Sequence, residues 1–308
     1  MIMDSKKLTV FMPVFNTEQY VKDTIDSILE QTYGDFEFLI IDDCSTDSSK
    51  EIIKSYTDKR IRLIELSKKI SLPEIINLGL QLTESEYIAF IDSDDLATPD
   101  RLKEQVEFLN ENQDIVAVSS DFQFFGSTDK YSKMPSGSEN IHLSLLFHNP
   151  IANPAAMIRM EPVRNANVKH REDYFACSDY AFWVDLSVIG KLENINKCFL
   201  KYRTGHNNST GTSQRDPGLR TKRKEILDKI HITALKNNQF NLNDDELVTF
   251  NMFFGDANVI IPEKGDFDKL LHVFSKLKTQ AESLPIDETL FDTILREKLN
   301  HIKVRYSF

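Results

Sequence analysis

The sequence predicts an α/β fold with a mostly parallel central sheet and a helical C-terminal appendage, and three observations predict it. Apolar, β-prone runs alternate with segments of helical periodicity over the first 110 residues. Such alternation is typical of parallel strands joined by right-handed helical crossovers. Two of the predicted strands run directly into groups of carboxylates. From about residue 220 onward, only helical patterns remain.

The first elements follow one another in order. The first strand is broken at Pro13, and the helix after it is expected to end at Gly34, since glycine commonly follows the last helical residue. Residues 45–49 supply possible N-caps for a second helix that ends at 56. The patterns predict strands at 8–15, 36–41, 60–66 and 87–91, and further helices at 18–31, 71–82 and 99–110.

Beyond residue 110 the patterns are less regular. Residues 115–125 suggest one or two strands, and the polar stretch 127–140 is expected to be a loop. We place a boundary near residue 215, between an α/β domain at 1–215 and a helical region at 216–308. The remaining expected elements are strands at 156–158 and 199–203, a helix that starts near 178, and C-terminal helices at 247–254, 270–277 and 290–299.

Composition excludes several classes of protein. Hydrophobic residues make up 41% of the 308, enough for a full core, so a disordered chain is not expected. The net charge of −11 argues against a general nucleic-acid binder, which needs a basic face. The three cysteines are widely spaced, which fits a reducing compartment. Without a signal-peptide pattern or a run of ~18 apolar residues, we expect a cytoplasmic protein that could still touch the inner face of the cell membrane.

The two acidic strand ends are the strongest pointers to a site. Asp92, Asp94 and Asp95 follow the fourth predicted strand, and Asp42 and Asp43 follow the second. The carboxyl ends of the strands in an open α/β sheet line its ligand crevice. Three adjacent acids repel one another unless a cation shares the site, and a divalent ion with a bound phosphate would do so. The alternative is that both groups are solvated turns that cap the following helices.

Four motifs carry a resemblance to a known family. Taken together and in this order, they resemble the family 2 glycosyltransferases with the GT-A fold, over about residues 8–210. The run 149–159 and the tripeptide 201–203 are also similar to bacterial lipooligosaccharide enzymes that add N-acetylglucosamine to galactose. The motifs are Pro13-Val14-Phe15-Asn16, Ile41-Asp42-Asp43-x-Ser45-Thr46-Asp47, Asp92-Ser93-Asp94-Asp95 and Asp179-Tyr180-x-Phe182-Trp183.

The resemblance implies a nucleotide-sugar donor, usually UDP-linked, and inversion at the anomeric carbon. It implies that Mn²⁺ or Mg²⁺ neutralises the diphosphate leaving group. By this match Asp94 is a direct metal ligand, with Asp92 and His206 as further candidates. The residues implied to bind the nucleotide sugar are Pro13, Phe15, Glu18, Asp42, Asp43, Asn77, Asp92, Ser93, Asp94, Trp183 and His206.

The same resemblance makes Asp179 the general base that takes the proton of the acceptor hydroxyl. Each assignment has a simpler alternative. Asp179, or Ser178 before it, could be the N-cap of the predicted helix. Phe15 and Trp183 could pack in the core, and His206 could be a solvated loop histidine.

Two departures from the family pattern bear on the activity. Ser178 stands where many members have Glu, and Ile75-Ile76-Asn77 replaces Ala-Arg-Asn, so an arginine facing the diphosphate is missing. Either could signal a weak enzyme or an altered donor. A Rossmann dehydrogenase is not expected, because no GxGxxG follows the first strand.

We therefore expect transfer from UDP-GlcNAc to a hydroxyl of a glycan, or of a lipid-linked glycan, in cell-surface polysaccharide or lipooligosaccharide synthesis. Transfer from UDP-galactose or UDP-glucose, and nucleotide-sugar binding without transfer, are the alternatives. The basic run 220–224 could rest on anionic lipid, or could be a solvated charged helix.

Overall fold

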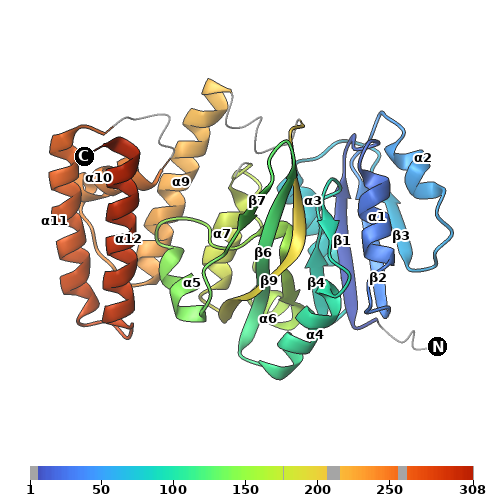
Figure 1. The fold of residues 1–308 in the computed structure, drawn as a ribbon, viewed down its shortest axis with the longest axis horizontal. Coiled ribbons are helices and arrows are strands. Elements are labelled where there is room, and N and C mark those ends of the chain that lie inside the picture. Colours follow the sequence, from blue (N-terminus) through green and yellow to red (C-terminus); the bar gives the residue numbers. More distant parts are fainter. Residues whose placement is uncertain (1–5, 176, 207–215, 256–261, 308) are drawn as a thin grey trace. The chain divides into compact units, whose positions relative to one another are not determined.

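The computed structural model describes residues 6–175, 177–206, 216–255 and 262–307. The chain divides into two compact units. One comprises Met1–Ser136 and Ile151–His206, and the other comprises Gly137–Pro150 and Asn207–Phe308. The first unit contains the α/β sheet and the second is helical (Figure 1).

One half of the sheet has the predicted parallel topology. Its strands lie in the order β3-β2-β1-β4, and each neighbouring pair is parallel. A helix directly follows each of the first three strands, as the alternating pattern predicts, and the short strand β5 comes between β4 and α4. The strands are β1 (Leu8–Val14), β2 (Phe36–Asp42), β3 (Ile61–Glu65) and β4 (Tyr87–Phe90), and the helices are α1 (Val21–Leu29), α2 (Ser49–Lys54), α3 (Leu72–Leu82) and α4 (Arg101–Glu111).

The other half of the sheet is mixed. β8 is antiparallel to both β4 and β6, whereas β9 runs parallel to β6 and antiparallel to β5. The order continues from β4 as β8-β6-β9-β5. β7 lies off this path and pairs with the C-terminal part of β6, at residues 122–124. The strands are β5 (Leu96–Ala97), β6 (Ile115–Gly126), β7 (Lys130–Ser132), β8 (Met157–Arg159) and β9 (Lys191–Thr204). The short elements η1 (Asn153–Ala155) and α6 (Met160–Ala166) flank β8, and α7 (Ser178–Leu186) precedes β9.

Three sequence-based predictions differ from the structure here. α1 ends at Leu29 and not at Gly34, and a short irregular segment follows before β2. The stretch 127–140 is not a plain loop, because it holds β7 and the start of α5. β9 begins at Lys191, well before the predicted 199–203, because its polar first half is held by pairing with β6 and not by its own apolar pattern.

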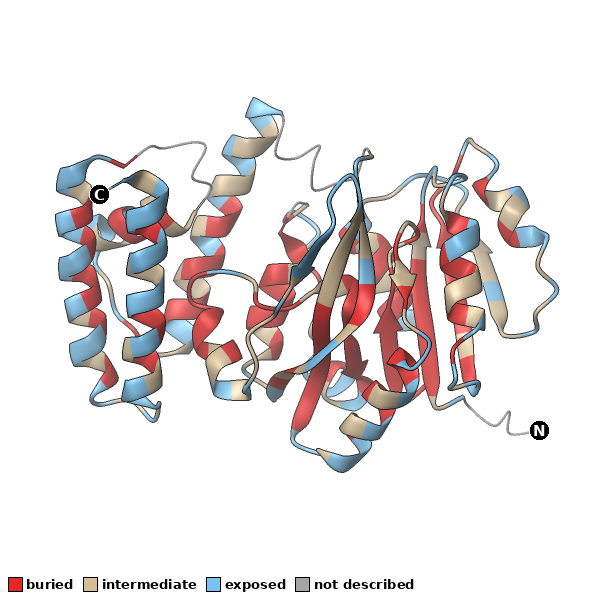
Figure 2. Cartoon of the chain, in the orientation of Figure 1, coloured by how far each residue is buried: buried red, intermediate tan, exposed pale blue. Residues whose placement is uncertain are grey.

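Strands β1, β2 and β4 form the centre of the core, and nearly all their residues are buried (Figure 2). Phe11 of β1 packs edge-on against Phe90 of β4, with ring centroids 6.0 Å apart. The Phe11 ring also touches α3 at Gly79, where an added Cβ would lie 2.7 Å from a ring carbon. α3 itself starts at a capping box between Ser71 and Glu74.

The second unit is built from helices around an aromatic cluster. Phe147 contacts Phe250 and Phe254, at ring-centroid distances of 5.6 and 5.0 Å. These contacts group the segment 137–150 with the C-terminal helices, whereas the predicted boundary near 215 left that segment in the α/β domain. The helices are α5 (Ser138–Ser144), α9 (Pro217–Asn237), α10 (Asp244–Phe254), α11 (Lys264–Ala281) and α12 (Glu288–Tyr306).

Among the residues that the structure describes, none of the helices is long and apolar enough to cross a membrane.

The contact between Gly79 and Phe11 gives a stability prediction. We expect Gly79→Val to lower the free energy of unfolding of the α/β unit by about 2 kcal/mol or more, because the added atoms overlap a ring that is fully buried. Urea unfolding followed by the fluorescence of Trp183, the single tryptophan, measures it. The matched control is Gly34→Val, since nothing lies within 4 Å of a Cβ there. Equal stability of the two variants would contradict the prediction.

Candidate active site

The candidate site lies at the carboxyl ends of β1, β2 and β4. This is the edge at which open parallel sheets bind ligands. Two loops that leave this edge, after β1 and after β2, are joined by hydrogen bonds between side chains and backbone. Thr46 N donates to Asn16 Oδ1 over 2.8 Å, and Ser48 N donates to Glu18 Oε2 over 2.8 Å. Glu18 therefore helps to hold these two loops together, and the joined loops form one wall of the candidate site.

Asp42 and Asp43, predicted to bind the nucleotide, are almost fully buried at the end of β2. Asp42 Oδ2 accepts from Ser45 N over 3.2 Å, whereas Asp42 Oδ1 is buried without a partner among the described residues. Asp43 Oδ1 accepts from Ile70 N over 2.9 Å. These acids anchor surrounding loops, so they are not freely solvated as the simpler alternative required.

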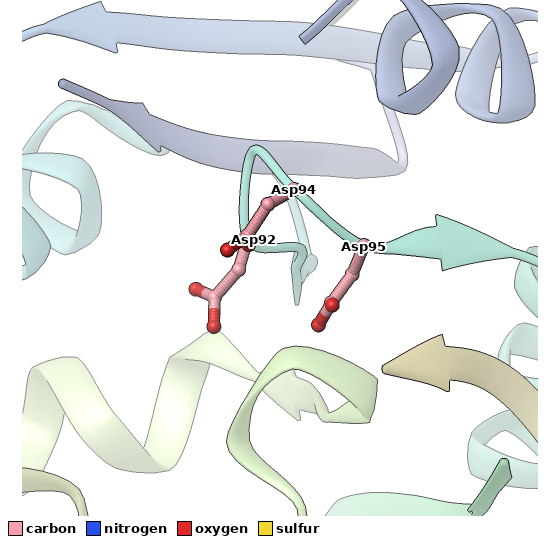
Figure 3. A group of neighbouring side chains, drawn as sticks. All are labelled: Asp92, Asp94 and Asp95. Atoms are coloured by element: carbon pink, nitrogen blue, oxygen red, sulfur yellow. The ribbon is translucent and has the colours of Figure 1, made fainter. Parts of the chain in front are cut away.

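The second acidic group forms the turn after β4 (Figure 3). Asp92, Asp94 and Asp95 each offer a carboxylate oxygen, and these oxygens all lie within 4.8 Å of one another. Burial, together with repulsion by Asp94 and Asp179, raises the pKa of Asp92 to about 7. Burial and the neighbouring acids also raise the pKa of Asp95 well above its usual range. The turn thus concentrates negative charge that a bound cation would relieve.

A fully buried arginine, Arg101, supports this turn. Its Nη2 donates to the carbonyls of Phe90 and Ala156 over 2.6 and 3.3 Å. Burial lowers the pKa of Arg101 to about 9, while the charges of Asp95 and Asp92 act to raise it. The guanidinium is therefore a partial counter-charge to the acids.

Strand β9 brings two basic residues to the same turn. Arg203 donates from its backbone N to Asp95 Oδ1 and from Nε to the carbonyl of Asp94, each over 2.8 Å. His206 Nε2 lies 2.5 Å from Asp94 Oδ2, and the His206 ring packs against the Tyr20 ring at an interplanar angle of 59°. His206 is therefore part of the cluster and is not a solvated loop histidine.

Asp179 comes from a separate element, helix α7. The helix begins at Ser178, its N-cap is Cys177, and no side chain caps it. Asp179 therefore lies inside the first turn, and the N-cap alternative for Asp179 and Ser178 is wrong. The charge of Asp179 is one cause of the raised pKa of Asp92, so the two carboxylates are close enough to interact.

The segment before α7 is held by Asn77. The two ends of the Asn77 amide pair with the backbone N and O of His170, over 2.8 and 2.9 Å. The His170 ring is buried, stacks on Phe182 and lies 3.4 Å from Ser178 Oγ. Asn77, predicted to contact the nucleotide, here supports the approach to Asp179; a direct ligand contact stays a prediction.

The remaining predicted residues differ in exposure. The Phe15 side chain is exposed (41%), so core packing does not explain it. Pro13 is half-buried and Ser93 is buried. Trp183 is 0% exposed and packs edge-on against Phe182, which favours its packing alternative over contact with a sugar.

Sequence reasoning missed four residues that the structure brings to this region: Lys69, Arg101, His170 and Arg203. Their contacts are distant in sequence, and only Arg203 lies in a motif, the tripeptide 201–203, which gave no role to its side chain. Arg101 was visible only as the start of a helix.

The donor set of the acidic turn fits a hard divalent cation. Such ions prefer carboxylate oxygens, and Asp95 Oδ2 is buried without a partner among the described residues. Asp92 and Asp94 are partly exposed at the same turn and could share the ion with a ligand.

The buried His170 gives a pH prediction. Burial lowers the pKa of His170 to about 3, so below pH ~6.5 the unfolded chain binds a proton that the folded chain does not. Stability is therefore lost as the pH falls, by about 2–3 kcal/mol between pH 6.5 and 4.5. Urea unfolding at both pH values should show a smaller loss in His170→Gln than in the wild type. His272→Gln, at an exposed position, is the control; an unchanged loss in His170→Gln would contradict the assignment.

Residues 9–165 match the family described as "Glycosyl transferase family 2". An uncharacterized glycosyltransferase of Haemophilus influenzae is 31% identical over 245 residues, which are 73% of this chain and 76% of that protein. The putative teichuronic acid biosynthesis glycosyltransferase TuaG of Bacillus subtilis is 29% identical over 220 residues, 65% of this chain and 80% of that protein.

Two solved structures share the fold. S. aureus TarS 1–349, in complex with UDP-GlcNAc, matches with a TM-score of 0.67 at 16% identity, over 98% of this chain and 91% of that one. The mannosyltransferase PcManGT from Pyrobaculum calidifontis, in complex with GDP-Man and Mn²⁺, matches with a TM-score of 0.56 at 14% identity, over 99% and 88%. The family match and the Haemophilus relative together establish that this chain belongs to glycosyl transferase family 2 and is a glycosyltransferase with the GT-A fold.

Proposed function

We propose that the protein transfers a hexose or N-acetylhexosamine from a UDP-sugar to a glycan hydroxyl by single displacement with inversion. The observation that carries the proposal is the meeting of two acidic groups from separate elements. The turn of Asp92, Asp94 and Asp95 follows β4, and Asp179 on α7 is close enough to raise the pKa of Asp92. One group suits a metal and diphosphate, and the other suits a general base.

UDP-GlcNAc is the donor that we favour. The TarS structure contains it, and the fold is shared over nearly the whole of this chain. The alternatives are UDP-galactose and UDP-glucose. The nucleoside would lie beside Phe15, Asp42 and Asp43, at the wall formed by the two joined loops.

Asp94, Asp92 and His206 would hold a divalent cation, Mn²⁺ or Mg²⁺. When bound, it supplies Lewis-acid neutralisation of the charge that grows on the diphosphate. His206 Nε2 already faces Asp94 Oδ2 at 2.5 Å, so a small rearrangement lets both contribute. The Mn²⁺ in the PcManGT structure is consistent with this choice.

Asp179 would accept the proton of the acceptor hydroxyl. The bond between the anomeric carbon and the diphosphate oxygen breaks, and the bond from the acceptor oxygen to that carbon forms on the opposite face. The nucleoside diphosphate leaves with the bonding electron pair. Asn77 and His170 would keep the start of α7 in place during this step.

The acceptor that we favour is a glycan or lipid-linked glycan of a cell-surface polysaccharide or lipooligosaccharide. The similarity to TuaG, whose name refers to teichuronic acid biosynthesis, supports a surface polymer. Such an acceptor would be met in the cytoplasm, at the inner face of the membrane, where basic residues of α9 such as Lys222 would favour anionic lipid.

Cation binding gives the first test. We expect Mn²⁺ to raise the melting temperature, and its affinity to increase as the pH rises through about 7, because Asp92 must lose its proton to act as a ligand. Differential scanning fluorimetry at several pH values measures both effects. Asp94→Asn should abolish the shift, whereas Asp114→Asn, at an exposed acid outside the cluster, should keep it. A full shift in Asp94→Asn would remove that residue as a ligand.

Turnover gives the second test. A screen of UDP-sugars with a glycan acceptor, read by UDP release, should identify the donor. We expect Asp179→Asn to lower kcat at least ~100-fold, because the general base is lost, while UDP binding is retained. Asp173→Asn, at an exposed acid in the segment before α7, is the control. Full activity of Asp179→Asn would sink the base assignment, and UDP-sugar binding without transfer in the wild type would favour a binding protein.

A further inference from the structure

The C-terminal part of β6 has β7 on one side and β9 on the other. Gln123 of β6 pairs with Tyr131 of β7 and with Lys201 of β9. Residues that pair across neighbouring strands point to the same face of a sheet, so these three side chains form one row. Tyr131 and Lys201 are exposed and Gln123 is half-buried, so the row faces solvent.

The same face leads to the acidic turn. Side chains alternate along a strand, so Phe125, two residues after Gln123, shares the face with its pairing partner Arg203. The Arg203 guanidinium lies 4.5 Å from the centre of the Phe125 ring, and its Nε donates to the carbonyl of Asp94 over 2.8 Å. Tyr131 lies two strands away from Arg203, or ~10 Å across the sheet, which is farther than a single sugar ring reaches.

The ring of Tyr131 is held in one orientation although the residue is 51% exposed. Its hydroxyl donates to Asp121 Oδ2 over 2.5 Å, and Asp121 Oδ1 accepts from Met134 N over 2.7 Å. Asp121 is 2% exposed, so a buried carboxylate is committed to this ring and to the segment after β7. A ring fixed in this way loses little conformational freedom when a ligand stacks on it.

The aromatic residues on the opposite face pack on one another. Phe122, Phe124 and Tyr202 have ring centroids 5.0, 5.9 and 5.7 Å apart. Phe122 and Tyr202 also pack against the core of the α/β unit. Packing therefore accounts for these rings, whereas it does not account for the exposed ring of Tyr131.

We propose that Tyr131 stacks on an inner sugar of the acceptor, so that the enzyme elongates an oligosaccharide or polysaccharide chain and does not act on a free monosaccharide. The terminal sugar presents its hydroxyl to Asp179, and the chain continues over the row of β9, β6 and β7. This inference rests on the proposed function, which makes the acceptor a glycan.

The chemistry of the row fits a glycan. A sugar ring has a face of C–H groups, which is attracted to the electron-rich face of a tyrosine ring. Its hydroxyls both donate and accept hydrogen bonds. Next to Tyr131, Gln123 Nε2 donates to Asp129 Oδ1 over 2.7 Å, and Lys201 adds an exposed ammonium, so donors and acceptors lie beside the ring. A lipid tail needs a continuous apolar surface, which Gln123 and Lys201 interrupt.

Transfer assays with acceptors of different length test the inference on the full chain. The acceptors are galactose, lactose and the galactose-terminated tetrasaccharide lacto-N-neotetraose, and UDP release from UDP-GlcNAc is measured with Mn²⁺. The proteins are the wild type, Tyr131→Ala, Tyr131→Phe and Lys130→Ala. Lys130 is the matched control, because it is exposed and adjacent but points to the other face of β7.

We expect kcat/KM of the wild type to be at least ~10-fold higher for the tetrasaccharide than for lactose. Tyr131→Ala should remove this preference and leave the value for lactose unchanged. Tyr131→Phe keeps the ring and loses only the hydrogen bond to Asp121, so it should keep most of the preference. Lys130→Ala should behave as the wild type does. Calorimetric titration should give the same UDP affinity for all four proteins, which shows that the donor half of the site is intact.

Direct binding completes the test. Titration of the tetrasaccharide into the protein with UDP and Mn²⁺ should show binding that Tyr131→Ala weakens ~10-fold. Equal use of lactose and the tetrasaccharide by the wild type, or no binding of the tetrasaccharide, overturns the inference. If Tyr131→Phe loses the preference as fully as Tyr131→Ala, the residue only holds β7 in place. Under each of these outcomes a wild type that binds UDP and releases it from a UDP-sugar keeps the proposed function, whereas a wild type that binds no UDP loses both.

Discussion

The acidic turn after β4 depends on the buried guanidinium of Arg101. Three carboxylates within one turn repel one another, and partial or full burial is the main cause of the raised pKa values of Asp92 and Asp95. Arg101 lies fully buried and bonds the carbonyls of Phe90 and Ala156. It therefore compensates the acids while joining the end of β4 to the entry of β8, where the parallel half of the sheet meets the mixed half. The exposed side of the turn is where the proposed cation and its ligand would bind.

The parallel half of the fold could be predicted because its information is local. Each strand from β1 to β4 is a short apolar run, each helix has its own periodicity, and α3 even carries a capping box that its sequence displays. The mixed half could be predicted less well, because its strands are defined by hydrogen-bonded pairing with strands distant in sequence and not by their own hydrophobic pattern. The first half of β9 is polar and partly exposed, yet it is a strand since β6 lies beside it. The place of the segment 137–150 could not be predicted for the same reason, because Phe147 contacts Phe250 and Phe254, far away in the sequence.

The candidate site divides in the same way. Carboxylates at strand ends are visible in sequence, and their convergence follows from parallel topology alone. What sequence could not supply is the partner of each group. Whether Asp179 caps a helix depends on the residue at which α7 begins. The structure makes Cys177 the N-cap, so Asp179 lies within the first turn of the helix. Phe15 and Trp183 are two aromatic residues with the same pair of alternatives, and their exposure is opposite. Phe15 begins the loop after β1, whereas Trp183 is buried within α7. Lys69 has no motif at all and emerged only from its contacts.

The position of His206 shows how the chain accommodates a departure from the family pattern. The stretch Tyr202-Arg203-x-x-His206 resembles a family element that more often reads Tyr-Arg-x-His, so this sequence has one residue more before the histidine. β9 pairs with β5 directly after the acidic turn, so its end is delivered to Asp94 and Asp95. Gly205 follows with a φ of +94°, and a Cβ there would lie 2.7 Å from the Cβ of Ser127. Only glycine tolerates both the backbone angle and the close approach. The extra residue is thus taken up in a turn that returns His206 to Asp94, and the cluster is completed from a strand that the sequence pattern only partly revealed.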